Sequence, residues 1–183
     1  MDDSIIVYSC LTGAYKGIKD NRVYVNPSDK FNSDRMNAKA PKVLSHLYLP
    51  IHEYSIWIDA NLELLISPLE LISLMDNKEC LVFTHPFRKT INEEIIACKN
   101  LDSFENLNYH KNKPGLLAAC GVIIRKNTQS VNRLNEYWWA EICRGSSRDQ
   151  LSFPYTLGTI SNYLKTQIEF PFNSKFIKWN PHE

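Results

Sequence analysis

The segment Tyr54–Asp59, which reads Tyr-Ser-Ile-Trp-Ile-Asp, constrains the fold of this chain more than any other. A short, mostly apolar run of this kind is typical of a strand buried on both faces of a sheet. In open α/β sheets the ligand crevice lies outside the carboxyl ends of the strands. A carboxylate there is costly unless it is paired, hydrogen-bonded or bound to a metal. Asp59 is therefore a candidate site residue, although an acid that only caps the following turn would give the same string.

Strands and helices are predicted to alternate along the rest of the chain. Apolar, β-rich runs predict further strands at 4–10, 23–25, 80–84 and 116–125. Helical spacing and capping signals predict helices at 34–49, 68–75, 91–99, 129–143 and 148–157. The alternation predicts an α/β fold with a mostly parallel central sheet flanked by helices, as a single domain over residues 1–183.

Two of these helices carry more specific expectations. Pro41 falls inside the helix predicted at 34–49, and it predicts either a kink or a helix that begins at this residue. In the helix predicted at 91–99, we expect Ile91, Ile95 and Ile96 to face the core.

Composition excludes several classes of protein. The net charge of +1, from 21 Lys and Arg against 20 Asp and Glu, provides no basic field for nucleic acid. Five scattered cysteines without a C-x-x-C pair indicate reduced thiols, and no apolar run is long enough to cross a bilayer, so we expect a cytoplasmic protein. The chain also lacks a Gly-rich phosphate loop, a G-x-S-x-G elbow and an H-E-x-x-H pair, which leaves P-loop NTPases, α/β-hydrolases and zincins without support.

Oxygen-bearing side chains near Asp59 indicate a divalent metal. Asn61 lies two positions further along and would point to the same side if the strand geometry continues. A carboxylate and an amide oxygen suit Mg²⁺ or Mn²⁺, which retain waters and phosphate oxygens as further ligands. His182 could complete the shell, although a histidine so close to the end of the chain is more often unstructured.

A cationic helix face precedes this strand. Arg35, Lys39 and Lys42 are spaced four and three residues apart, so one face of a helix would carry all three. Such a face suits a diphosphate, whose negative charge increases as it leaves. The alternative is an ordinary solvated helix surface.

The third candidate is the string Ser147–Phe153, which reads Ser-Arg-Asp-Gln-Leu-Ser-Phe. Asp149 and Gln150 could form paired hydrogen bonds with sugar hydroxyls, and Asp149 could act as a base or as an electrostatic partner of positive charge at the anomeric carbon. The alternative is that Ser147 or Asp149 simply caps the helix that follows.

Three blocks together resemble one family. They are Ala40–His46, Tyr54–Asp59 and Ser147–Tyr155, and in this order they are similar to the TOD1/MUCI70 glycosyltransferase-like family, formerly a domain of unknown function. The resemblance implies a GT-A-type nucleotide-sugar fold in which Asp59 belongs to a DxD-like metal motif. It also implies that Lys42 and its neighbours approach the diphosphate and that the Arg-Asp-Gln block lines the sugar pocket.

The chain departs from the usual motif of this fold in one respect. The usual motif has two acids, whereas this chain has Asp59-Ala60-Asn61. More distantly, the cationic helix before an acid-tipped strand is similar to that of glycogenin-like transferases, in which a late histidine often completes the metal shell; that similarity points to His182.

The leading hypothesis is therefore a metal-dependent hexosyltransferase that uses a nucleoside diphosphate sugar and a glycan or other hydroxyl acceptor. The loop after the first strand, with Thr12, Gly13 and Tyr15, would hold the base and ribose, and Arg35, Lys39, Lys42 and Asp59 the diphosphate and its Mn²⁺ or Mg²⁺. Two alternatives stay open: a metal-dependent hydrolase of a phosphate ester or amide-linked lipid, and a non-catalytic module that binds sugar nucleotides or glycans. The sequence does not indicate an oligomeric state.

Overall fold

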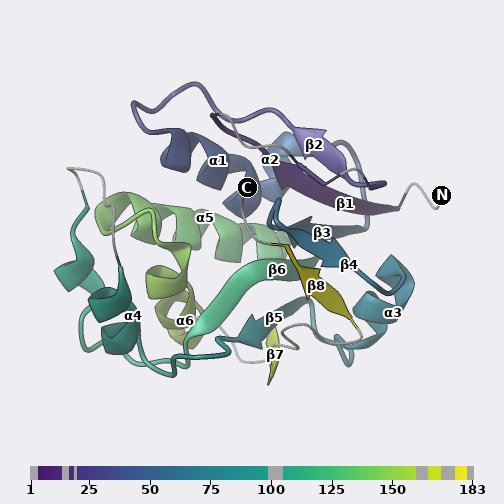
Figure 1. Cartoon of the computed structure of the whole chain (residues 1–183). Helices are drawn as coiled ribbons and strands as arrows, with labels where there is room; N and C mark the ends of the chain where they lie inside the picture. The colour runs from purple at the N-terminus through teal and green to yellow at the C-terminus, as the bar shows by residue number, and fades with distance from the viewer. Residues whose placement is uncertain are drawn as a thin grey trace.

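A six-stranded sheet in the order β2-β1-β3-β6-β5-β7 forms the centre of the molecule (Figure 1). The computed structural model describes residues 4–13, 17–18, 20–98, 105–159, 165–169 and 176–180, with the backbone alone at 158–159 and 165–169. The strands are β1 (Ile5–Cys10), β2 (Val23–Val25), β3 (Tyr54–Ile58), β5 (Cys80–Thr84), β6 (Ala118–Lys126) and β7 (Lys165–Glu169). Only β6 is antiparallel to its neighbours, so the prediction of a mostly parallel sheet is confirmed.

Helices and a small second sheet cover this central sheet. The helices are α1 (Asp34–Val43), α2 (Ser45–Tyr48), α3 (Pro68–Ser73), α4 (Ile91–Ala97), η1 (Leu107–His110), α5 (Gln129–Arg144) and α6 (Asp149–Thr159). The second sheet pairs β4 (Leu62–Leu64) antiparallel with β8 (Ile177–Trp179). No helix in the described part of the chain is both long and apolar enough to span a bilayer.

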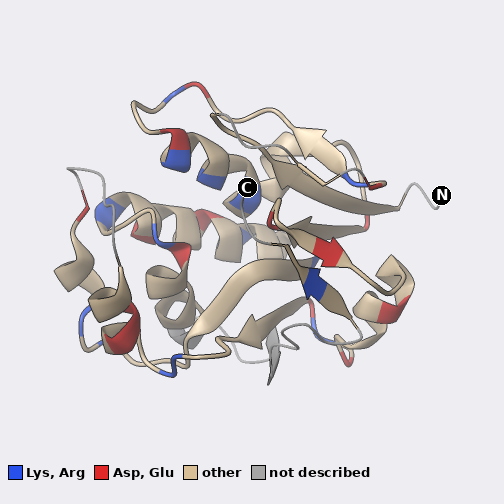
Figure 2. Cartoon of the chain, in the orientation of Figure 1, with Lys and Arg blue, Asp and Glu red and all other residues tan. Residues whose placement is uncertain are grey.

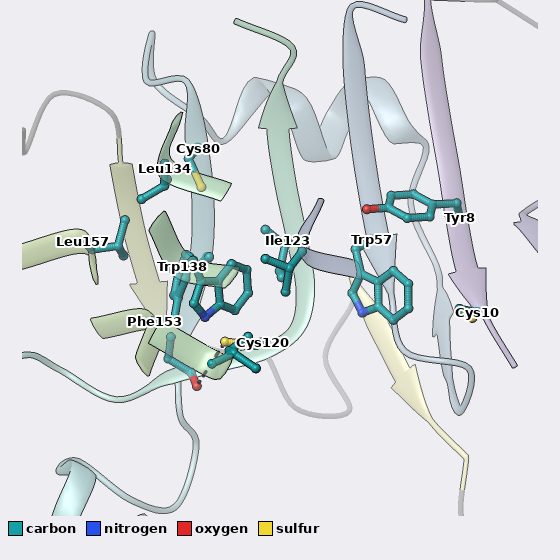
Figure 3. Packing of buried hydrophobic residues seen from close by; sticks show 14 of the residues in the cluster. Tyr8, Cys10, Trp57, Cys80, Cys120, Ile123, Leu134, Trp138, Phe153 and Leu157 are labelled. Atoms are coloured by element: carbon teal, nitrogen blue, oxygen red, sulfur yellow. Dashed lines mark hydrogen bonds between the residues drawn. The ribbon is translucent and has the colours of Figure 1, made fainter. Parts of the chain in front are cut away.

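The two faces of the central sheet bury separate clusters of apolar side chains, because successive residues of a strand point to opposite faces. On one face Tyr8 and Trp57 pack edge to face at 5.2 Å, and side chains of α1, α5 and α6 complete the cluster (Figure 3). On the other face Ile56 and Ile58 pack with side chains of α3, β4 and β8. Trp57 therefore points toward α1, and so does Asp59, which lies two residues beyond it.

The helix predicted at 34–49 is two helices, because the chain leaves helical geometry at Leu44 (φ −94°, ψ 47°). Pro41 lies inside α1, near its end, and does not begin the helix. Since proline has no N–H, the carbonyl of Asn37 lacks its usual helical partner, and it accepts a 2.9 Å hydrogen bond from the Ser28 amide instead.

Helix α4 corrects one detail of the expected core. Ile91 is buried and Ile95 partly buried against Leu117 and Leu151, as expected. The prediction for Ile96 is wrong: its side chain is 84% exposed, because one further residue along a helix turns the side chain away from the buried face.

Candidate functional site

The carboxyl ends of β1, β3 and β5 lie at one edge of the sheet. These strands run in the same direction, so the residues that follow Cys10, Ile58 and Thr84 lie at this edge, where antiparallel β6 begins. Asp59 is fixed there by its backbone amide, which donates a 2.8 Å hydrogen bond to the Gly121 carbonyl of β6.

Two adjoining pockets open at this edge and share Arg35, Lys39, Lys42 and Asp59. The smaller pocket, about 240 Å³, is completed by Cys120, Gly121, Ser147, Arg148, Asp149 and Gln150. The larger pocket, about 390 Å³, is completed by Cys10, Leu11, Thr12, Gly13, Asp34, Ala38, Trp57, Ala60 and Asn61. The four shared residues thus form the boundary between the two pockets.

A chain of alternating charges runs across this boundary. Lys42 Nζ lies 3.1 Å from Asp59 Oδ1 and 2.7 Å from Asp149 Oδ2. Lys39 Nζ lies 2.9 Å from the other carboxylate oxygen of Asp149. The Lys42 and Asp149 side chains are only 3% and 4% exposed, so their charges depend on each other for compensation.

The pKa values follow from burial and from these contacts. Burial opposes the charge on Asp149, but Lys39 and Lys42 outweigh it and hold the pKa of the carboxyl well below its usual range. Burial would lower the pKa of Lys42, but Asp149 and Asp59 together raise it. Lys39 faces only Asp149 closely, and burial leaves its pKa lowered. Asp149 therefore carries a full negative charge at neutral pH.

Asp59 keeps one carboxylate oxygen available to a ligand. Oδ1 accepts hydrogen bonds from Trp57 Nε1 at 2.7 Å and from Lys42. Oδ2 has no hydrogen bond or ion pair within the described residues, lies 3.4 Å from where a Cβ on Gly121 would stand, and belongs to a side chain that is 41% exposed. The lack of a side chain at Gly121 thus leaves space for this oxygen.

This arrangement fits a divalent metal only if the ligand supplies most of the coordinating oxygens. The described residues contain no group of three or more His, Cys, Asp or Glu side chains placed to hold a metal. Asp59 and Asn61 both line the larger pocket, and Mg²⁺ in enzyme sites is commonly held by one or two carboxylates together with substrate phosphates and water. The residues present therefore fit an ion held mainly by the ligand's phosphates, and His182 lies outside the described residues.

Arg22 fixes the turn that carries Asp59. Its guanidinium is fully buried and donates to Ser9 Oγ at 3.0 Å and to the carbonyls of Asp59 and Leu62, while Asp20 pairs with it at 2.6 Å. The carbonyls of Asp59 and Leu62, which flank Ala60 and Asn61, are thereby held by a side chain that lines neither pocket.

Arg125 of β6 fixes the end of α1 in a similar way. It donates to the carbonyls of Lys42 at 2.8 Å and Val43 at 3.0 Å, and to Tyr8 Oη at 2.6 Å. A cation beside the last carbonyls of a helix is favourable, because these carbonyls have no partner within the helix. Lys42 is thus held at its backbone as well as at its side chain.

Glu105 holds in place the segment before α6, which lines the smaller pocket. Its carboxylate accepts hydrogen bonds from the hydroxyls of Ser146 and Ser147 and from the Ser147 amide at 3.1 Å. It also lies 3.8 Å from Arg35 Nη1, so it connects the segment before α6 to α1.

The structure brings together most of the residues that the sequence singled out. Arg35, Lys39, Lys42, Asp59, Asp149 and Gln150 line the smaller pocket, and Thr12, Gly13 and Asn61 line the larger one. Tyr15, like His182, lies outside the described residues. His85, which follows β5 at the same edge of the sheet, lines neither pocket: its Nδ1 accepts hydrogen bonds from the amides of Phe87 and Arg88, and burial, with Arg88, lowers its pKa to about 4.

Sequence reasoning did not find Gly121, Arg22, Arg125 or Glu105. The available signal was weak in each case: Arg125 ends the apolar run of β6, where a charge needs a partner, and Gly121 interrupts the same run. Arg22 and Glu105 lie in segments without periodicity, and their partners are distant in the sequence.

Comparison with known proteins identifies the family. The family model for the TOD1/MUCI70, glycosyltransferase-like domain matches residues 12–112 and 104–177, which is most of the chain. This chain belongs to that family. The TOD1/MUCI70 identification confirms the resemblance that rests on the three sequence blocks.

Two Arabidopsis thaliana members of the TOD1/MUCI70 family are similar in sequence. One is named a probable hexosyltransferase, MUCI70, and is 29% identical over 154 residues, 72% of this chain and 26% of the relative. The other is named alkaline ceramidase TOD1 and is 35% identical over 91 residues, 46% of this chain and 18% of the relative. The chain thus spans about a quarter or less of the length of these relatives.

Solved structures similar to this TOD1/MUCI70 domain include two transferases. A glycosyltransferase involved in glycosylation of the major capsid of PBCV-1 superposes with a TM-score of 0.48 at 10% identity, over 92% of this chain and 82% of that one. Mouse xyloside xylosyltransferase 1 superposes with a TM-score of 0.46 at 13% identity, over 78% of this chain and 55% of that one.

Proposed function

We propose that this chain is the donor-binding domain of a hexosyltransferase that takes its sugar from a nucleoside diphosphate sugar and transfers it to a hydroxyl of a glycan or other acceptor. The observation that carries the proposal is the position of Lys39 and Lys42, which line both pockets between Asp59 and Asp149. When the bond between the anomeric carbon and the diphosphate breaks, negative charge builds on the departing diphosphate. Cations already fixed at that position stabilise the charge without reorganisation.

The two pockets suit the two halves of such a donor. The larger pocket, with Thr12 and Gly13, would take the nucleoside, and the smaller pocket would take the sugar. The diphosphate would then lie over the shared boundary, where the cationic side chains are.

A divalent ion, Mn²⁺ or Mg²⁺, completes this proposal. Asp59, through Oδ2, and Asn61 would hold it beside the diphosphate, and the bound ion would supply further neutralisation of phosphate charge. Lys42 and Trp57 keep the Asp59 carboxylate oriented, because both donate to Oδ1 and leave Oδ2 directed to the pocket.

Asp149 and Gln150 have different parts in the proposed site. Asp149 is suited to holding Lys39 and Lys42 in place and to stabilising positive charge at the anomeric carbon, because its lowered pKa makes it a poor proton acceptor. Gln150 lines the smaller pocket, where its amide can donate to and accept from sugar hydroxyls.

A calorimetric titration tests the proposal. The chain is titrated with UDP-, GDP- and ADP-hexoses, with and without Mn²⁺, as wild type and as Asp59→Ala. We expect at least one donor to bind, binding to tighten with Mn²⁺, and the Mn²⁺ effect to disappear in the variant. Binding that is equal in wild type and Asp59→Ala would remove the metal role, and no binding of any donor would remove the donor assignment.

A hydrolase remains the second candidate, because one relative is named an alkaline ceramidase. Incubation of the chain with ceramide in the absence of any sugar donor separates the two activities. Release of fatty acid that depends on Asp59 would favour the hydrolase, whereas donor-dependent consumption of an acceptor favours the transferase.

A further inference from the structure

The charged residues of α1 are one acid at its first position followed by three bases. Asp34 begins the helix, and Arg35, Lys39 and Lys42 follow on the face that lines the pockets; Figure 2 shows an acidic first turn followed by three basic positions. A helix rises about 1.5 Å per residue, so Asp34 and Lys42 lie roughly 12 Å apart along its axis. One helix therefore presents Asp34, with Arg35 beside it, at one end of the larger pocket, and Lys39 and Lys42 toward the other end.

The Asp34 carboxylate is available to a ligand. Asp34 lines the larger pocket, is exposed, and forms no hydrogen bond or ion pair within the described residues. Its Oδ2 lies 4.0 Å from where a Cβ on Gly13 would stand, so it faces the loop after β1 across the pocket. The helix cap does not use it, because the Ser33 hydroxyl accepts from the Met36 amide instead.

This position selects a particular kind of ligand group. A carboxylate repels phosphate, so a phosphate would lie at the Lys39 and Lys42 end of the pocket. Two adjacent carboxylate oxygens can accept two hydrogen bonds from neighbouring hydroxyls, and hydrogen bonds to a charged acceptor are the stronger kind. In a nucleoside diphosphate sugar, the ribose and the transferred sugar both carry adjacent hydroxyls. The proposed function places the transferred sugar in the smaller pocket, so in the larger pocket, which Asp34 lines, the group with two adjacent hydroxyls is the ribose.

We infer that Asp34 binds the ribose 2′- and 3′-hydroxyls of the donor, so that the site requires a ribonucleoside diphosphate sugar and would reject a sugar carried on a lipid phosphate. The inference rests on the proposed function, because it assumes that the cationic end of the pocket takes a diphosphate. Asp34 then fixes the direction of the donor and places the sugar in the smaller pocket.

Binding of donor fragments tests this assignment. UDP, GDP, ADP and CDP, their 2′-deoxy forms, and inorganic pyrophosphate are titrated calorimetrically into wild type, Asp34→Asn and Asp29→Asn. Asp29 is an exposed acid in the neighbouring loop that lines neither pocket, so its variant controls for the loss of one negative charge. Unfolding curves confirm that each variant is folded.

The expected result is a selective loss. For the tightest ribonucleotide, wild type should bind the 2′-deoxy form about tenfold more weakly, as the loss of one hydrogen bond to a charged acceptor predicts. Asp34→Asn should bind the ribonucleotide about tenfold or more weakly, with little preference for the ribo form, and should bind pyrophosphate at least as well as wild type. Asp29→Asn should behave as wild type.

Other results overturn the inference in distinguishable ways. If Asp34→Asn and wild type bind the ribonucleotide with equal affinity, Asp34 does not bind the ribose, and the proposed function stands. The same conclusion follows if Asp34→Asn changes the preference among bases but keeps the preference for the ribo form. If wild type binds pyrophosphate but none of the nucleotides, the ribose site is contradicted and the cationic site is retained. Binding of none of the probes by wild type removes the proposed function together with the inference.

Discussion

Lys42 Nζ lies 2.7 Å from Asp149 Oδ2, and this ion pair joins α1 to the first residue of α6. Both side chains are almost fully buried, although they line a pocket. The pair therefore serves two purposes: it holds the two walls of the smaller pocket together, and it keeps a lysine charged where a diphosphate is proposed to bind.

Replacing Lys42 by Met should destabilise the fold. The change leaves the buried Asp149 with only Lys39, and breaking a buried ion pair from one side typically costs about 3–5 kcal/mol. Lys39→Met should cost less, because Lys39 is more exposed and contacts one carboxylate instead of two. Urea unfolding followed by circular dichroism measures both, and equal losses would contradict the central position of Lys42.

The same pair should shape the acid stability of the protein. Because the pKa of Asp149 is lowered in the folded state, the folded state binds fewer protons than the unfolded chain below about pH 4, the usual pKa of Asp. The stabilisation is thus present above that pH and is lost as the pH falls toward the lowered value.

The variant Asp149→Asn tests that pH dependence. It should be less stable at pH 7, and its free energy of unfolding should fall less steeply than that of wild type on acidification. The exposed Asp29→Asn variant should retain the steep acid limb. Parallel acid limbs in wild type and Asp149→Asn would show that Asp149 does not account for the acid sensitivity.

The sequence predicted several strands of the central sheet with correct bounds, but it did not predict every strand of the structure. The predicted strands at Val23–Val25 and Cys80–Thr84 match the observed bounds, because these runs are apolar, β-rich and bounded by turn residues. Strands β4, β7 and β8 were not predicted. Strands β4 and β8 pair with each other across more than 100 residues of sequence, and β7 pairs with β5, which is also distant in the sequence. Local patterns do not encode such pairing.

In the candidate site, too, the sequence predicted some residues and not others. Asp59, Lys42 and Asp149 were predicted because each stands in a recognisable local string. Arg22 and Glu105 were not, because a buried charge is recognised only by partners that the fold supplies, such as the carbonyl of Leu62 or the hydroxyl of Ser147.

Substituting Arg22 by Lys should weaken the Asp59 turn. Lysine retains the charge but not the planar fork that reaches Ser9, the Asp59 carbonyl and Asp20 together. A loss of about 1–3 kcal/mol in unfolding free energy is expected for the carbonyls left without a donor. Arg133→Lys, at an exposed position of α5, is the matched control and should be neutral.

Arg22→Lys should also affect ligand binding selectively. If Arg22 positions Asp59 and Asn61, the enhancement of nucleotide binding by Mn²⁺ should fall, while metal-free binding of pyrophosphate to Lys39 and Lys42 should change little. Calorimetry of both ligands measures the difference. Equal weakening of both would indicate a general loss of structure and not a role in positioning.

Gly121→Ala should separate ligand binding from folding. A Cβ at this position would lie 3.4 Å from Asp59 Oδ2 and 3.0 Å from Leu62 Cδ1, so it would occupy the space in front of the free carboxylate oxygen. The leucine side chain can adjust, and alanine reduces the conformational freedom of the unfolded chain, so stability should change by less than about 1 kcal/mol. Because a metal ion at Oδ2 needs that space, Mn²⁺-dependent binding of the sugar nucleotide should fall about tenfold, which corresponds to roughly 1.4 kcal/mol. Titration with and without Mn²⁺, beside an unfolding curve, measures both quantities, and unchanged Mn²⁺ dependence in a folded variant would place the ion away from Oδ2.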